Sequence, residues 1–204
     1  ISNENKKIEL SQYLKNNKFN VNTNNVEYIT IFNSSRNEYE CVENWNKNVF
    51  YEDDEDLIHE ICQKYINDNS KFFILRVHPN LRYYENSQNR KINELKKLKN
   101  IHVIDGSVKM SSYQLLNISS KVITFGSTIG VESNFYRVPV ICIGDSAYKY
   151  LNISYNPISK NDLFKMIDSK LENKPLLGSL KYGYYIEEFG YNFKHKNSVT
   201  IQYS

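Results

Sequence analysis

Short apolar segments alternate with amphipathic ones along residues 26–173 of the chain. The apolar segments are rich in β-branched and aromatic residues, which is typical of strands. Because their apolar character is continuous, they predict strands that are buried on both faces, as in parallel sheets. The predicted strands are residues 26–33, 71–77, 101–105, 121–125 and 139–144.

The segments between these strands repeat their apolar residues at helical spacing. Residues 53–68 show this most clearly, because Leu57, Ile58 and Ile61 follow the i, i+3, i+4 pattern. Strands that alternate with helices predict an α/β fold, with a Rossmann-like parallel sheet and helices on both faces. The other predicted helices are residues 90–100, 111–119, 127–136 and 159–173.

The regular pattern stops before either end of the chain. Residues 1–25 are polar and open on Ile1, so we expect a linker or the remnant of a preceding region. Residues 26–175 form the predicted Rossmann-like domain. Residues 176–204 are aromatic and punctuated by glycine, and we expect an irregular tail packed on that domain.

Composition narrows the class of protein. A chain of 204 residues can bury a sizeable core. Its net charge of +3 comes without a long block of one sign, so the sequence does not indicate a nucleic-acid partner. The three cysteines, Cys41, Cys62 and Cys142, are expected to be reduced, and no apolar run is long enough to span a bilayer. We therefore expect a cytoplasmic protein.

Glycine is scarce in the chain, yet three of its seven glycines fall within residues 122–144. The predicted strand 121–125 ends at Gly126, and Ser127 and Thr128 open the next predicted helix. Uncovered amides, two hydroxyls and the positive end of a helix dipole suit a phosphate group. Glu132 lies one turn further on and can accept hydrogen bonds from ribose or sugar hydroxyls. An ordinary turn and helix cap would explain the same residues.

A second candidate group follows the predicted strand 71–77. Strand alternation places Arg76 and His78 on one face, and Pro79 keeps His78 extended. An imidazole in this position can donate to a phosphate oxygen as the phosphate becomes a leaving group. A histidine that caps a loop is the alternative interpretation.

The acidic run YEDDEDL, residues 51–57, could be interpreted as a metal site. We favour an acidic first turn of the helix 53–68, which the helix dipole stabilises. The sequence has no Cys-x-x-Cys motif and no clustered histidines, so zinc is not expected. We expect no metal and no cofactor.

Two of these segments carry a resemblance to a known family. ILRVHPNLR (residues 74–82) followed by VITFGSTIGVESNFYRVPVI (residues 122–141) resembles the carboxyl-terminal, donor-binding half of the capsular polysaccharide glycosyltransferases. More distantly, it is similar to sialyltransferases and Kdo transferases of the GT-B fold that use CMP-sugars. Residues 29–40 and 182–190 extend the likeness over about residues 27–195.

The resemblance implies one half of a GT-B fold and a set of site residues. His78 would act on the donor phosphate as the catalytic group, beside the phosphate-binding Gly126, Ser127 and Thr128. Glu132 would hold the ribose or sugar. Ser34, Ser35 and Arg76 would complete the phosphate site.

The same resemblance implies a preceding acceptor domain that supplies the general base. The chain departs from some GT-B donor sites, because Val140 stands eight residues after Glu132 where a second glutamate would be expected.

The predicted function is nucleotide-sugar binding, with a CMP-linked donor and a glycan acceptor, in bacterial capsular polysaccharide synthesis. We also expect peripheral association with membrane-bound polysaccharide machinery. A nucleotide-sugar epimerase and a non-catalytic binding or scaffold module remain as alternatives.

Overall fold

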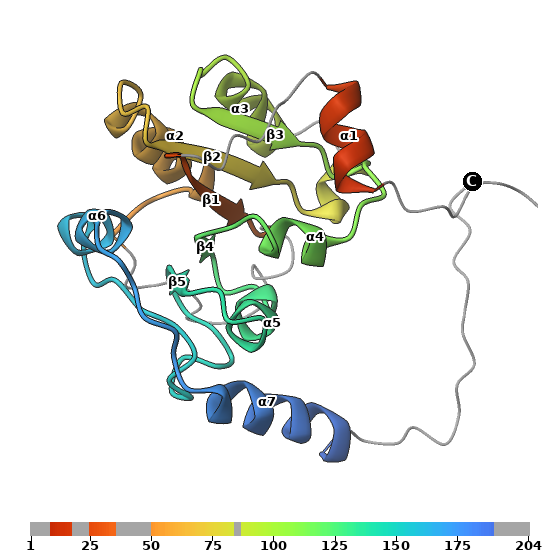
Figure 1. Ribbon diagram of the computed structural model, residues 1–204, viewed down its shortest axis with the longest axis vertical. Helices are drawn as coiled ribbons and strands as arrows, with labels where there is room; N and C mark the ends of the chain where they lie inside the picture. The colour runs from red at the N-terminus through yellow and green to blue at the C-terminus, as the bar shows by residue number, and fades with distance from the viewer. Residues whose placement is uncertain (1–8, 18–24, 36–49, 84–86, 190–204) are drawn as a thin grey trace, which may run out of the picture.

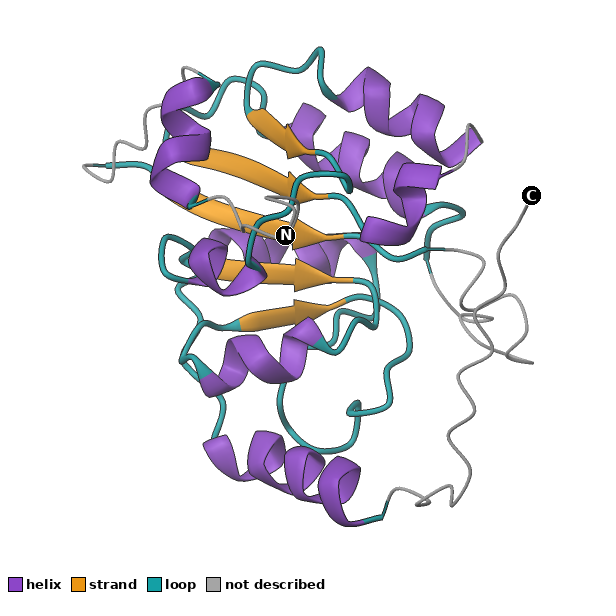
Figure 2. Ribbon diagram, turned by 90° about the vertical axis from the view of Figure 1, so that its right-hand side faces the viewer, coloured by secondary structure: helices purple, strands orange, loops and turns teal. Residues whose placement is uncertain are grey.

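The computed structural model describes residues 9–17, 25–35, 50–83 and 87–189 of the chain. Within these residues, five parallel strands form one sheet in the order β3-β2-β1-β4-β5 (Figures 1 and 2). The strands are β1 (Glu27–Phe32), β2 (Lys71–Arg76), β3 (Ile101–Ile104), β4 (Lys121–Thr124) and β5 (Val140–Cys142). The predicted Rossmann-like α/β fold and all five predicted strands are thus confirmed.

Helices cover both faces of this sheet. One face is covered by α2 (Asp54–Lys64), α3 (Ser87–Leu95) and α6 (Lys160–Asp168), whose apolar sides join the larger core cluster. The opposite face is covered by α1 (Leu10–Asn16), α4 (Ser112–Leu116) and α5 (Ile129–Phe135). Because successive strand residues point to opposite faces, Ile29 and Ile31 enter the first core while Tyr28 and Phe32 enter the second.

Two helices lie where the sequence analysis expected none. Helix α1 lies within the segment interpreted as a linker, and its Leu10 and Tyr13 are buried against the sheet. Helix α7 (Leu176–Glu188) lies within the segment interpreted as an irregular tail, and it packs beside α5 (Figure 1). The expectation of an irregular tail was therefore wrong for residues 176–188. The division of the chain into a linker, a domain and a tail stays a prediction.

The cysteine prediction can be followed for two of the three residues. Cys62 and Cys142 are buried and make no disulfide, and burial raises the pKa of the Cys62 thiol to about 12. Cys41 lies outside the described residues, as do residues 190–204 at the end of the predicted tail. Among the helices that the structure describes, none has the length and apolar character needed to cross a bilayer.

Candidate functional site

The sheet order reverses between β1 and β4, which are neighbours although β2 and β3 lie between them in the chain. In open α/β sheets, ligands bind beyond the carboxyl ends of the strands at such a reversal point. Ser34 and Ser35 follow β1 at this edge, and Gly126, Ser127 and Thr128 follow β4. His78 follows β2, the strand on the other side of β1. Because the strands are parallel, all these groups lie at the carboxyl end of the sheet. At the usual strand spacing, the ends of β2 and β4 lie about 10 Å apart.

The loop after β4 contains a backbone conformation that favours glycine. Gly126 has a φ of 81°, in the left-handed region that glycine adopts without strain. The Ser127 amide donates to Thr124 Oγ1 at 3.1 Å, which ties the turn to the end of β4. Gly126 and Ser127 are half-buried and Thr128 is exposed. Thr128 occupies the N-cap position of α5, but its side chain makes no capping hydrogen bond.

Gly130 has a different reason to be glycine. A Cβ there would overlap the hydroxyl oxygen of Tyr148 and come within 2.9 Å of its Cζ. Tyr148 is fully buried, and its hydroxyl donates to the Ser127 carbonyl oxygen at 2.8 Å. The absence of a side chain at Gly130 therefore leaves room for the Tyr148 ring, whose hydroxyl holds the loop after β4.

The His78 loop is held by its backbone. The His78 amide donates to Asn33 Oδ1 at 2.9 Å, and His78 Nδ1 accepts from the Asn80 amide at 3.3 Å. Because Nδ1 accepts, the ring proton belongs on Nε2, which leaves Nε2 as the donor of the neutral imidazole. Gly106, which follows β3, allows the loop after β3 to pack closely against the His78 backbone. A Cβ at position 106 would lie 2.6 Å from the His78 carbonyl oxygen.

Ser34 and Ser35 lie beside the reversal point, but both are buried. The Ser34 hydroxyl donates to Asp54 Oδ2 at 2.5 Å, and its backbone amide is 3.4 Å from the same oxygen. In this arrangement the Ser34 hydroxyl supports the loop after β1. A role in contacting a donor stays a prediction for both serines.

The structure does not bring Arg76 into this group. Its guanidinium is buried and donates to the backbone carbonyls of Asp105 at 2.7 Å and Val108 at 2.9 Å. Burial lowers the pKa of Arg76, and the two carbonyls accept hydrogen bonds from its two terminal nitrogens. Arg76 therefore fixes the loop after β3, a role that the strand alternation could not reveal.

Two buried acidic residues beside the loop after β1 were not predicted to be part of the site. Asp54 and Glu55, in the first turn of α2, are 8% and 1% exposed. Burial raises the pKa of Asp54 to about 7, and the neighbouring Glu55 adds to this rise, while hydrogen bonds from Ser34 oppose it. The acidic first turn itself was predicted and is confirmed. The helical spacing carried the missed signal, because Asp54 lies three and four residues before Leu57 and Ile58 on the apolar face.

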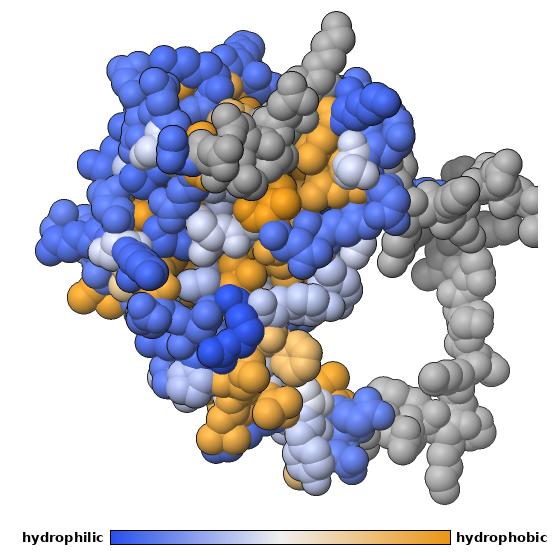
Figure 3. Space-filling view, viewed as in Figure 1, coloured by the Kyte–Doolittle hydropathy of each residue, from blue (hydrophilic) through white to orange (hydrophobic). Residues whose placement is uncertain are grey.

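Glu132 lines a groove of about 540 Å³ between α4, α5 and α7, and residues 126–128 do not line it. The Tyr113 hydroxyl donates to the Glu132 carboxylate, and this interaction raises the pKa of Tyr113. Apolar side chains gather over α7 on this side of the molecule (Figure 3). The groove is lined by Tyr113, Val131, Glu132, Phe135, Tyr136, Ser179, Leu180, Gly183 and Tyr184. The predicted contact with ribose or sugar would therefore have to be made in this groove.

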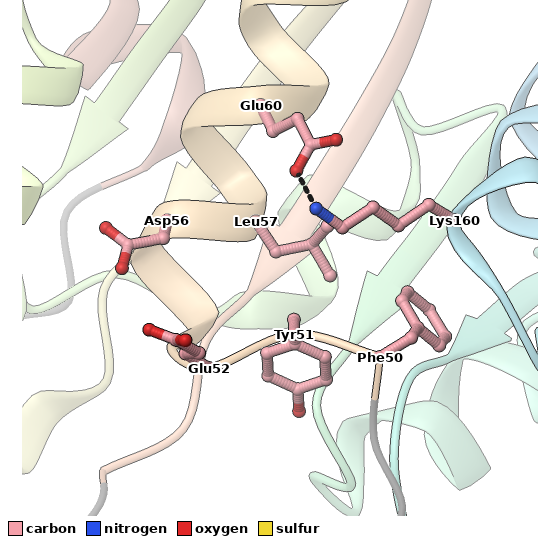
Figure 4. Close-up of a pocket in the computed structure, with 7 residues that line it drawn as sticks. All are labelled: Phe50, Tyr51, Glu52, Asp56, Leu57, Glu60 and Lys160. Atoms are coloured by element: carbon pink, nitrogen blue, oxygen red, sulfur yellow. Dashed lines mark hydrogen bonds and ion pairs between the residues drawn. The ribbon is translucent and has the colours of Figure 1, made fainter.

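A second hollow, of about 450 Å³, lies between α2 and the start of α6 (Figure 4). Glu52, Asp56 and Glu60 line it, and Lys160 Nζ lies 2.5 Å from Glu60 Oε2. None of the predicted site residues lines this hollow. Among the described residues, no three His, Cys, Asp or Glu side chains are grouped as a metal site requires.

A comparison with solved structures finds an enzyme of the same fold. The chain is similar to the UDP-GlcNAc 2-epimerase of Methanocaldococcus jannaschii in complex with UDP-GlcNAc and UDP, with a TM-score of 0.50 and 19% identity, over 81% of this chain and 46% of that one. It is also similar to two structures of Thermosulfurimonas dismutans KpsC. The beta Kdo 2,7 transferase gives a TM-score of 0.48 and 14% identity, over 71% of this chain and 43% of that one. The beta Kdo 2,4 transferase gives a TM-score of 0.42 and 15% identity, over 78% of this chain and 44% of that one.

The similarity to the epimerase structure concerns the fold alone. The chain spans less than half the length of each of the three structures. A comparison with curated proteins found no match. A family model described as capsule polysaccharide biosynthesis protein matches residues 46–170, more than half of the chain. The match includes both motifs that carried the resemblance, and the chain belongs to the family of capsule polysaccharide biosynthesis proteins.

Proposed function

We propose that the chain binds the nucleotide part of an activated sugar at the carboxyl edge of its sheet. The observation that carries this proposal is the juxtaposition at the reversal point: the Gly126–Thr128 loop follows β4, and His78 follows β2 on the same edge. The fold accommodates such ligands, since the epimerase of the same fold is in complex with UDP-GlcNAc and UDP. Family membership favours a role in making capsular polysaccharide.

The proposed activity is glycosyl transfer by the protein to which this chain belongs. The backbone amides of the β4 loop would bind the donor phosphate, and Nε2 of His78 would donate to the phosphate as the bond to the sugar breaks. The general base that activates the glycan acceptor would come from a preceding domain. We propose a CMP-linked donor, which follows from the sequence resemblance, and a cytoplasmic location beside the polysaccharide machinery.

Calorimetric titration of the chain with CMP, UDP and GDP tests this proposal. We expect CMP to bind most tightly and Ala substitution of His78 to weaken it about 10- to 100-fold, the range for a lost hydrogen bond to a charged group. His59→Ala is the matched control, because His59 is an exposed histidine on α2. A preference for UDP would favour the epimerase alternative. Binding that is absent, or that is unchanged in His78→Ala, would contradict the proposal.

A further inference from the structure

Glu55 is a buried carboxylate that accepts hydrogen bonds from two neutral side-chain amides. Its Oε1 accepts from Asn33 Nδ2 at 3.2 Å and from Gln88 Nε2 at 2.8 Å. A buried charge costs free energy, and apolar residues of similar size often serve stability equally well. What Glu55 contributes can therefore be sought in the groups that it contacts.

Each of the two amide side chains also makes a hydrogen bond to a loop of the proposed site. Asn33 Oδ1 accepts the His78 backbone amide at 2.9 Å, and Gln88 Nε2 also donates to the Ser34 carbonyl oxygen at 2.9 Å. Glu55 thus connects the loops that follow β1 and β2 through one carboxylate oxygen.

The chemistry of the carboxylate fixes the direction of this connection. The Asn33 NH₂ group donates to Glu55 Oε1, so it faces the carboxylate. The Asn33 carbonyl oxygen then faces the opposite way, toward the His78 amide. With no acceptor at position 55, the Asn33 side chain would lose the contact that sets this orientation.

We propose that Glu55 is the positioning residue of the nucleotide site, acting through Asn33 to hold the His78 loop in place. This inference rests on the proposed function. It assigns no contact with the ligand to Glu55, whose effect on binding passes through His78.

Two measurements on Glu55→Ala test the inference. The first is hydrogen exchange of the His78 backbone amide in the ligand-free chain, which we expect to become at least about tenfold faster while the amides of β4 keep their protection. The second is the dissociation constant for the nucleotide, which we expect to rise about tenfold. Glu60→Ala, on the same helix, should change neither. Glu55→Gln should recover most of both losses, because its carbonyl oxygen can accept from both amides.

A double variant separates positioning from general destabilisation. Glu55→Ala combined with His78→Ala should bind as weakly as His78→Ala alone, because Glu55 acts through His78. Losses that multiply, or an unchanged exchange rate at His78 in a folded Glu55→Ala chain, would overturn the inference. If Glu55→Ala does not fold, Asn33→Ala must cause the same loss of protection at His78, and retained protection overturns the inference. Since exchange is measured without ligand, a chain that binds no nucleotide would contradict the proposed function and leave this test intact.

Discussion

At the scale of single residues, the two glycines around α5 serve different physical needs. Gly126 supplies a left-handed backbone conformation, with a φ of 81°. Gly130 supplies space, because Tyr148 packs where a side chain would begin. The first need belongs to the backbone alone, and a glycine after a predicted strand indicates it. The second depends on Tyr148, which the sequence does not connect to Gly130.

Gly130→Ala should destabilise the chain by about 1–3 kcal/mol, the usual cost of overpacking a core. The added Cβ would collide with the Tyr148 hydroxyl and displace the bond to the Ser127 carbonyl. Chemical denaturation measures the effect. In a Tyr148→Phe background the same substitution should cost less, since the nearest atom is gone. Equal costs in both backgrounds would show that the collision is not the cause.

Asp54 should give the chain a stability that falls as pH rises. Its pKa is about 7 in the folded chain against an ordinary value of 3.8, so the folded state holds the proton more tightly. The stabilisation is complete below about pH 4 and is lost as pH rises through about 7, at about 1.4 kcal/mol for each unit of difference.

Asp54→Asn mimics the protonated acid and should remove this dependence. The variant should be more stable than the natural chain at pH 8, and the difference should shrink as pH falls until the two converge below about pH 4. Denaturation between pH 5 and 8 measures the difference. Asp56→Asn, at an exposed position that pairs with Lys91, is the control and should show a constant difference. If the difference in stability between Asp54→Asn and the natural chain does not change with pH, the raised pKa of Asp54 is contradicted.

At the scale of elements, α7 is positioned by close contact and by buried polar groups. Asn134 Nδ2 on α5 donates to Ser179 Oγ at 2.8 Å, and Ser179 Oγ donates to the Val131 carbonyl oxygen at 3.1 Å. At Gly178 the helix backbone approaches the Leu151 carbonyl so closely that a Cβ would overlap its oxygen. These contacts explain why a helix forms from a sequence rich in glycine and tyrosine, which have modest helix propensity.

Gly178→Ala should therefore detach α7 from the domain. Because the overlapping atom belongs to the backbone, we expect a loss of about 1–3 kcal/mol and faster hydrogen exchange along 176–188. Gly183→Ala is the matched control on the same helix, since nothing lies within 4 Å of a Cβ there. It should be neutral or stabilise the chain by up to about 1 kcal/mol. Similar effects for both substitutions would mean that α7 is not held by this contact.

At the scale of the whole molecule, the sequence predicted the layers of the fold better than the details of its site. Apolar strands and helical spacing depend on local patterns, so the five strands and helices α2 to α6 were predicted, with errors of up to five residues at their ends, whereas α1 and α7 were not. The roles of Arg76, Asp54 and Glu55 depend on which loops meet at the sheet edge. Arg76 was assigned to phosphate, yet it binds two backbone carbonyls after β3.

The amides that shift when nucleotide binds give the most direct test of the central claim. A ¹⁵N-labelled chain titrated with CMP should show its largest chemical-shift changes at Ser34, Ser35, His78 and residues 126–128, at the carboxyl ends of β1, β2 and β4. Largest changes along the α4–α5–α7 groove, or none anywhere, would contradict binding at the reversal point of the sheet.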